Sequence, residues 1–196
     1  DCGIHVLDAP NEIIPAALNY LGMDGNSHKP ADIKKAAALL AKVRPYVQKF
    51  HSSEYINALA NGDICLAVGW SGDVFQAAAR AEEAKNNVNV TYIIPKEGAL
   101  MWFDMMAIPG DSKHVTEAHE LINFLMRPDV IAKASNYVFY ANGNLSSQKL
   151  LDPEMLNDPA IYPSKKTLKN LYVTTPYSAK VQRVVTRAWT KVKTGQ

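Results

Sequence analysis

The sequence predicts an α/β fold, and two observations support this class. Short apolar runs that suit buried strands alternate along the chain with segments whose apolar residues recur at helical spacing. The chain has 196 residues, of which 47% are hydrophobic and 20% charged, so it can bury a substantial core as one ordinary domain or two small lobes. No apolar run approaches the roughly 18 to 20 residues that a membrane-spanning helix needs.

The first half of the chain predicts helices that alternate with short strands. Its opening residues, DCGIHVL, look like the end of a strand or loop from the middle of a domain, which favours a processed chain or a fragment. Pro15 is expected in or near the first turn of its helix, because deeper inside it would remove a hydrogen bond. We expect strands at 47–51 and 63–70 and helices at 11–21, 30–44, 52–62 and 71–87, the third of them opened by a serine and closed by Gly62.

The second half begins with two further apolar runs, at 89–95 and 99–109, which could pair as antiparallel strands across a Lys-Glu-Gly turn. Beyond them the chain returns to helical patterns. We expect helices at 115–127, ending before Pro128, at 129–138 and at 177–195, with loops and short helices at 144–176.

Several function classes find no support in the composition. The formal net charge is only +2, with both signs mixed along the chain, so it suggests neither a nucleic-acid partner nor a membrane surface. The five histidines and two cysteines show no metal-ligand spacing, and we expect no zinc site. No glycine-rich phosphate loop or dinucleotide fingerprint indicates a cofactor.

The cysteines, Cys2 and Cys65, both lie in apolar, strand-like runs. They are either two buried thiols or a disulfide, and a disulfide would place the protein in an oxidising compartment.

The run LAVGWSGDV, residues 66 to 74, places Trp70 and Asp73 where a strand turns into a helix. Ligands of open α/β sheets bind at that end of the strands. Capping of the helix by Ser71 or Asp73 is an alternative, although it leaves Trp70 unexplained. The run also resembles the G-x-S-x-G turn of serine hydrolases, with Ser71 as nucleophile, but Asp73 stands where the second glycine belongs.

The run LMWFDMMAI, residues 100 to 108, repeats the combination of tryptophan and aspartate. Strand alternation would put Trp102 and Asp104 on one face, among apolar neighbours. A buried carboxylate there costs several kcal/mol unless it is paired, either with a distant basic residue or with a ligand. If Asp73 and Asp104 face one cleft with both tryptophans alongside, the acidic ends and aromatic walls suit an organic cation.

The final helix carries a basic stripe opposite an apolar one. The stripe consists of Lys180, Arg183, Arg187 and Lys191. It is either a solvated face or a docking surface for a partner protein.

Several long stretches resemble the periplasmic polyamine-binding proteins of bacterial ABC importers, the putrescine and spermidine receptors. They include CGIHVLDAPNEIIPAALNYLG, FHSSEYINALANGDICLAVGWSGDVFQAAARA, NVTYIIPKEGALMWFDMMAIP, RPDVIAKASNYVFYANGN and RAWTKVKTG. The resemblance runs the whole length of the chain. It implies the carboxyl-terminal part of a longer protein, with the signal peptide removed and most of the amino-terminal lobe missing.

The family fold is of the type II periplasmic binding protein kind, with two α/β lobes closing around a ligand cleft. The resemblance implies that residues 1–84 and 148–196 belong to the second lobe and that residues 85–147 return to the first. It also implies a disulfide between Cys2 and Cys65. The expected protein is a non-enzymatic receptor that passes its ligand to an inner-membrane ABC permease, with no nucleic-acid partner.

The family's ligand-binding positions carry over onto matching motifs. Asp104 in WFD and Asp73 in GWSGD would take the amino groups, and Trp70 and Trp102 would flank the methylene chain. Other implied contacts are Glu12 in DAPNE at the far amine, Tyr140 in VFYAN at one side, and Ser52 in FHSSEY as a polar contact. Pro15 departs from the family pattern, in which this helix has no proline.

The resemblance leaves the ligand open. An indole at Trp102 and a third acidic group at Glu12 favour the three amines of spermidine over the two of putrescine. The alternatives are a receptor of the same fold for another organic cation or an amino acid and, more remotely, a hydrolase that uses Ser71.

Overall fold

The computed structural model describes residues 2–195 and has the α/β architecture that the sequence predicts. Three short parallel strands form a sheet in the order β2-β1-β3. The strands are β1 (Gly3–Val6), β2 (Val47–Phe50) and β3 (Ile64–Val68). β1 lies in the centre, so each of its neighbours is reached by a helical crossover.

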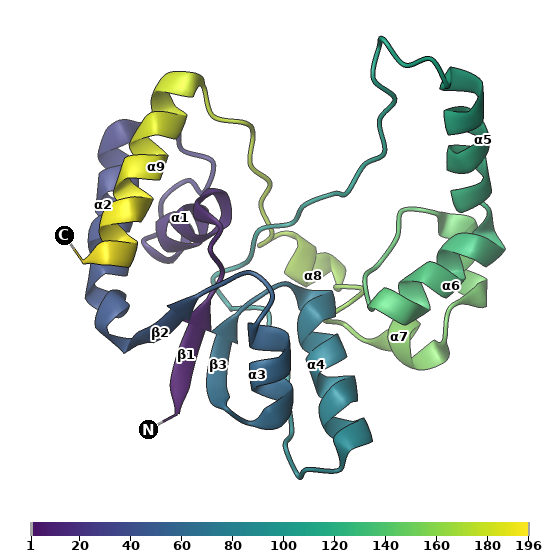
Figure 1. The fold of residues 1–196 in the computed structure, drawn as a ribbon, viewed down its shortest axis with the longest axis horizontal. Helices are drawn as coiled ribbons and strands as arrows, with labels where there is room; N and C mark the ends of the chain where they lie inside the picture. Colours follow the sequence, from purple (N-terminus) through teal and green to yellow (C-terminus); the bar gives the residue numbers. More distant parts are fainter. Residues whose placement is uncertain (1, 196) are drawn as a thin grey trace.

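Helices cover both faces of this sheet (Figure 1). One face is covered by α1 (Pro10–Tyr20), α2 (Pro30–Val43) and α9 (Ala179–Thr194), and the other by α3 (Tyr55–Asn61) and α4 (Ser71–Ala84). A 3₁₀ turn, η1 (Arg44–Tyr46), leads from α2 into β2. The sequence-based prediction of these strands and helices is confirmed within a few residues.

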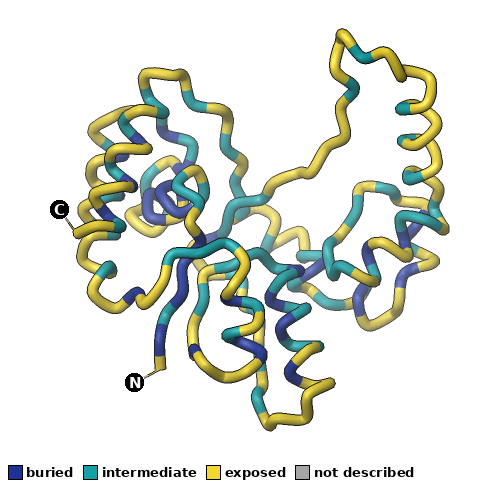
Figure 2. Tube along the Cα trace, viewed as in Figure 1, coloured by how far each residue is buried: buried dark blue, intermediate teal, exposed yellow. Residues whose placement is uncertain are grey.

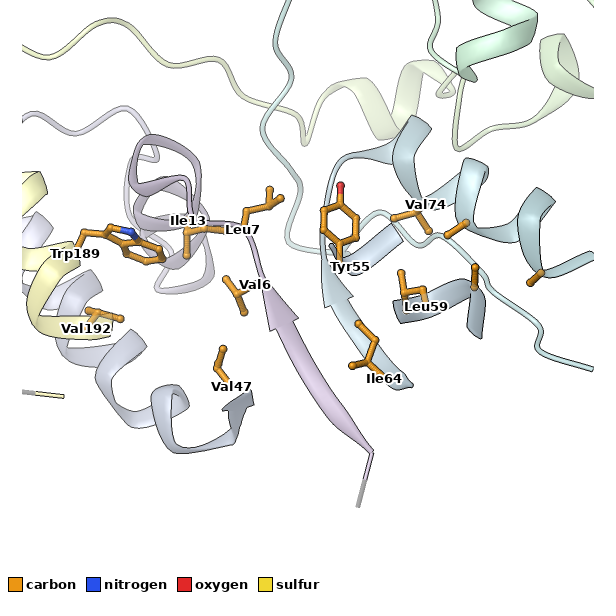
Figure 3. Packing of buried hydrophobic residues seen from close by; sticks show 13 residues of the cluster. Val6, Leu7, Ile13, Val47, Tyr55, Leu59, Ile64, Val74, Trp189 and Val192 are labelled. Carbon is orange, nitrogen blue, oxygen red and sulfur yellow. The ribbon is translucent and has the colours of Figure 1, made fainter. Parts of the chain in front are cut away.

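The core lies on both sides of β1 (Figure 3). Val6, Val47 and Trp189 pack on the side of α9, while Tyr55 and Val74 pack on the side of α3 and α4. A second cluster joins the three helices of one face and includes fully buried Ile14, Leu18, Ile33 and Val185. Burial of each such side chain contributes about 1.5–3 kcal/mol, so these helices are held firmly against the sheet.

A second group of elements lies apart from the sheet, on the right in Figure 1. It contains α5 (Val115–Leu125), α6 (Pro128–Val138), the 3₁₀ helix η2 (Leu145–Leu150) and α7 (Pro153–Asn157). Its small core joins Ala132 of α6 to Leu151, Met155 and Ile161, with Phe75 of α4 packed against it. Residues just beyond 148 therefore pack on α6, and the division of the chain into 1–84, 85–147 and 148–196 stays a prediction.

Two connections join this group to the sheet: residues 85–114, and a return segment with the short helix α8 (Lys165–Leu168). They touch through an isolated bridge between Leu100 and Tyr172. The antiparallel strands expected at 89–95 and 99–109 are wrong, because apart from this bridge residues 88–108 find no strand partner within the described chain. Figure 2 shows the connection that leads to α5 as a long exposed segment. Within it, Met105 keeps 86% of its surface in solvent.

Two expectations about helix geometry are also wrong. Pro15 is the sixth residue of α1 rather than part of its first turn. It has no backbone N–H to donate to the helix, but its ring is buried and contributes to the core. No serine caps α3: the Nδ1 atom of His51 accepts from the backbone N–H groups of Ser53 and Glu54, at 3.1 Å each. These two N–H groups precede the helix, so the ring of His51 stabilises the turn that leads into α3 and does not cap its first turn.

A disulfide joins Cys2 and Cys65, with their Cα atoms 5.4 Å apart. Cys2 directly precedes β1 and Cys65 lies within β3, so the disulfide ties the start of β1 to β3. The disulfide prediction is confirmed. In the part of the chain that the structure describes, none of the helices has the length and apolar character needed to cross a bilayer.

Candidate functional site

The carboxyl ends of the three parallel strands meet at one edge of the sheet, where ligands of such sheets bind. Each strand leads there into the first turn of a helix. Glu12 lies in the first turn of α1, Tyr55 begins α3, and Asp73 lies in the first turn of α4, three residues after Trp70. Side chains distant in sequence are thereby brought together.

Asp73 is held by two tyrosines. The hydroxyl of Tyr55 donates to Oδ2 of Asp73 at 2.7 Å, and the hydroxyl of Tyr140 donates to Oδ1 at 3.3 Å. The Tyr55 oxygen also accepts from the backbone N–H of Trp70 at 3.1 Å. No side chain caps the start of α4, so the carboxylate of Asp73 is used for these contacts and the capping alternative finds no support.

Both tyrosines stay protonated donors over the ordinary pH range. Burial raises the pKa of Tyr55, and the neighbouring carboxylate of Asp73 raises it further. The pKa of Tyr140 is also raised, by burial first and then by the charges of Asp73 and Asp104. A tyrosinate beside this carboxylate is strongly disfavoured, so Asp73 receives hydrogen bonds from two neutral hydroxyl groups.

Trp70 is fixed by an acidic side chain from a different helix. Its Nε1–H donates to Oε2 of Glu12 at 2.6 Å. Burial raises the pKa of Glu12, and the hydrogen bond from the indole partly offsets this because it stabilises the carboxylate. The indole ring is thus oriented by a second carboxylate, separate from that of Asp73.

The other tryptophan reaches the same place from the connecting segment. The ring centroids of Trp70 and Trp102 are 6.5 Å apart, and those of Trp102 and Tyr140 are 5.9 Å apart in an edge-to-face arrangement. The structure therefore brings together an aromatic and acidic cluster, which we call the Trp/Asp cluster. Its members are Glu12, Tyr55, Trp70, Asp73, Trp102 and Tyr140.

Asp104 lies at the edge of this cluster, close enough for its charge to raise the pKa of Tyr140. It is exposed, as is Phe103 with 65% of its surface accessible. The expectation of a buried carboxylate is wrong, because the segment forms no strand within the described chain and nothing there covers it. Ser52 lies directly after β2, but no hydrogen bond among residues 2–195 joins it to the cluster.

The glycines of LAVGWSGDV have a structural explanation. A Cβ atom on Gly69 would overlap the ring of Tyr55, and one on Gly72 would overlap the ring of Tyr140. Both glycines therefore let a tyrosine approach the backbone around Asp73. Among the described residues, no hydrogen bond links Ser71 to a histidine. The serine-hydrolase interpretation therefore finds no catalytic base for Ser71 there.

Sequence reasoning missed Tyr55, although it forms the most buried contact of the cluster. The available signal was its place in FHSSEYINA, at the carboxyl end of a predicted strand and at the start of a helix. A tyrosine that is fully buried usually finds a partner for its hydroxyl, and here it finds two. Within residues 2–195 no cluster of three or more histidine, cysteine, aspartate or glutamate side chains could hold a metal ion.

Comparison with known proteins identifies the family. Residues 5–163 match the model of the bacterial extracellular solute-binding proteins. The chain is 52% identical over its whole length to the putrescine-binding periplasmic protein PotF of Escherichia coli and 50% identical to the putrescine-binding periplasmic protein SpuD of Pseudomonas aeruginosa. In both cases it spans 53% of the relative, so it corresponds to about half of their length.

Solved structures agree with this assignment. The crystal structure of the spermidine/putrescine ABC transporter substrate-binding protein PotD of Streptococcus pneumoniae superposes with a TM-score of 0.81 at 28% identity. The match covers 98% of this chain and 58% of that one. The sheet, its helical crossovers and the turns that carry the Trp/Asp cluster are those of a known fold, and the chain belongs to the bacterial extracellular solute-binding proteins.

Proposed function

We propose that this chain is the carboxyl-terminal part of a periplasmic receptor that binds polyamines and delivers them to an ABC permease of the inner membrane. The observation that carries the proposal is the Trp/Asp cluster, in which two tyrosines orient Asp73 beside two neighbouring indole rings. The names of the relatives, putrescine-binding and spermidine/putrescine-binding proteins, support the same class of ligand.

The chemistry of the cluster suits a protonated amine on an alkyl chain. Carboxylates form strong, charge-assisted hydrogen bonds with ammonium groups, and indole faces attract cations by about 0.5 to 2 kcal/mol. In this proposal Asp73 and Asp104 take the amino groups, while Trp70 and Trp102 flank the methylene chain. Glu12 approaches the far amine, Tyr140 closes one side, and Ser52 adds a polar contact. No step of this function breaks a covalent bond.

The other wall of the site would come from an amino-terminal lobe. The chain spans about half the length of its curated relatives, and the connecting segment leaves apolar side chains exposed. On this segment lie exposed Phe103, Met105 and Met106, and the helix that follows it, α5, exposes Leu121 and Phe124. We assign residues 1–84 and 148–196 to the second lobe and residues 85–147 to the first, so that the missing lobe would cover this apolar surface.

For the ligand itself, charge count favours spermidine. Glu12, Asp73 and Asp104 offer three acidic groups to its three amines, and the indole of Trp102 offers a longer face than phenylalanine would. The names of the two relatives near 50% identity favour putrescine instead. Replacing Trp102 with phenylalanine should therefore weaken spermidine binding more than putrescine binding, and equal losses for both ligands would argue against this role of the indole.

A tryptophan-fluorescence titration of the full-length receptor with spermidine, putrescine and a neutral amino acid tests the proposal. We expect saturable changes with the polyamines only, because Trp70 and Trp102 line the site. Asp104→Asn should cost a polyamine at least tenfold in affinity, since a charge-assisted contact is lost. Ser71→Ala should leave binding intact, whereas loss of a hydrolytic turnover in that variant would support the hydrolase instead. No fluorescence change with either polyamine would refute the proposed site.

A further inference from the structure

The small net charge of the chain hides a strong separation of charge along it. Residues 1–158 carry nineteen acidic and thirteen basic side chains, a net of −6, whereas residues 159–196 carry eight basic side chains and no acidic one. Most of this positive charge lies on α9, the helix that covers one face of the sheet. The net value of +2 is therefore a poor guide to what this surface attracts.

The basic residues of α9 point away from the core. The helix buries Val185, Trp189 and Val192 on one side, and it exposes a stripe on the other. The stripe consists of Lys180, Arg183, Arg187 and Lys191, all exposed, with exposed Thr186 and Thr190 beside them. Its first and last residues are eleven positions apart, or about 16 Å at the rise of an α-helix.

The stripe has no counter-ions in the described part of the chain. None of its four side chains belongs to an ion pair there, whereas Lys193, which lies off the stripe, is paired with Asp8 at 2.8 Å. α2 packs beside α9 and adds exposed Lys34, Lys35 and Lys42. We call these seven residues of α2 and α9 the basic face.

The basic face lies at the end of the molecule opposite α5 (Figure 1). It is formed by the outer surfaces of two helices, whereas the Trp/Asp cluster lies at the carboxyl ends of the strands. A partner on the basic face would therefore leave the cluster free to bind its ligand.

The composition of the basic face indicates the class of its partner. Five of its seven residues are lysines, which are depleted from protein–protein interfaces, and the stripe offers no exposed aromatic or large apolar side chain as an anchor. Several unpaired charges on flexible stems, spread over a rigid surface, are instead complementary to many small, mobile anionic groups. Phospholipid headgroups have this chemistry.

We propose that the basic face binds anionic phospholipid headgroups and holds the receptor at the surface of the membrane that contains its permease. The attraction is electrostatic only, because the apolar side of α9 is buried in the core and cannot insert. Each lysine or arginine near an anionic surface contributes about a fivefold factor in partitioning, so four of them together give binding that is weak, reversible and sensitive to salt. This inference concerns a surface separate from the ligand site and holds whichever polyamine the receptor prefers.

Sedimentation of the full-length receptor with vesicles tests the proposal. We expect binding to mixed phosphatidylethanolamine and phosphatidylglycerol vesicles at low ionic strength and none to phosphatidylcholine vesicles. Added salt should release the protein, because screening lengths fall to about 10 Å at 0.1 M. The variant Lys180→Gln, Arg183→Gln, Arg187→Gln, Lys191→Gln should lose at least tenfold in partitioning, with its polyamine titration unchanged.

The matched control removes the same amount of charge elsewhere. Lys96, Lys113, Lys133 and Lys149 are exposed and lie outside the basic face. Their glutamine variant should partition within about threefold of the natural protein, since long-range charge is screened. Equal losses in both variants, or no salt-sensitive binding to the anionic vesicles, would overturn the proposal. A stripe variant that binds vesicles normally but no longer supports transport in permease proteoliposomes would overturn it too, and would indicate an acidic protein surface as the partner.

Discussion

Replacing Tyr55 with phenylalanine removes a single oxygen atom that makes two hydrogen bonds. The hydroxyl donates to Asp73 at 2.7 Å and accepts from the backbone N–H of Trp70 at 3.1 Å, and the residue is fully buried. A hydrogen bond to a charged group contributes about 1.5–3 kcal/mol and a neutral one about 0.5–1.5 kcal/mol. Asp73 keeps its contact with Tyr140, and Trp70 is partly exposed, so we expect the lower end of the range, about 2 kcal/mol less free energy of unfolding.

The substitution should also weaken polyamine binding, because Asp73 loses the shorter of the two bonds that orient its carboxylate. We expect about a fivefold loss in affinity, which corresponds to about 1 kcal/mol. Urea unfolding followed by circular dichroism gives the first quantity, and ligand titration gives the second. Tyr137→Phe is the control, since Tyr137 keeps 83% of its surface in solvent and should change stability by less than about 0.5 kcal/mol. If the two variants proved equally stable, the role assigned to the Tyr55 hydroxyl would be refuted.

Two further predictions concern the disulfide and the buried carboxyl group. The bond between Cys2 and Cys65 closes a sequence separation of 63 residues, so replacing both cysteines with alanine should lower the free energy of unfolding by about 4 kcal/mol, measured by urea titration without reductant. The folded-state pKa of Glu12 is raised by burial above its ordinary value of 4.5, so its stabilising contribution is fully present below that value and is lost as pH rises through the folded-state pKa. Glu12→Gln should therefore gain stability relative to the natural protein as pH rises through this window. Over the same window the natural protein should bind polyamines more tightly. Parallel profiles of unfolding free energy against pH for the two proteins would contradict this.

Local patterns in the sequence predict most of the fold, because helix ends, helical periodicity and apolar strand runs each give a strong and separate signal. Glycine at Gly22 and Gly62 marks two helix ends, and both adopt the left-handed conformation that glycine permits. The alternation of apolar runs with helical periodicity gives the three parallel strands and their crossovers. Strand-end reasoning also predicts that Trp70 and Asp73 lie at the carboxyl edge of the sheet, and there the structure brings them together in the Trp/Asp cluster.

What the sequence could not show depends on contacts between distant segments. The runs around Trp102 look like strands, but a strand forms only where a neighbour supplies hydrogen bonds, and this depends on the whole fold. The exposure of Asp104 has the same origin. The hydrogen bonds that His51 accepts before α3 and the two bonds of Tyr55 depend on side-chain geometry that spacing does not encode. Pro15 sits inside a helix because burial against the core outweighs the lost donor.

The sheet order β2-β1-β3 has a consequence for how such a receptor can change its ligand. Each strand is followed by a turn that supplies one member of the Trp/Asp cluster: Glu12 after β1, Tyr55 after β2 and Asp73 after β3. Hydrogen bonds link these turns, from Trp70 to Glu12 and from Tyr55 to Asp73. A substitution in one turn therefore changes the support of a side chain in another, and the effects of substitutions in two turns should not simply add. The coupling is strongest at Tyr55, because its ring belongs to the core and its hydroxyl bonds to Asp73. At this residue a substitution changes the stability of the fold and the geometry of the cluster together.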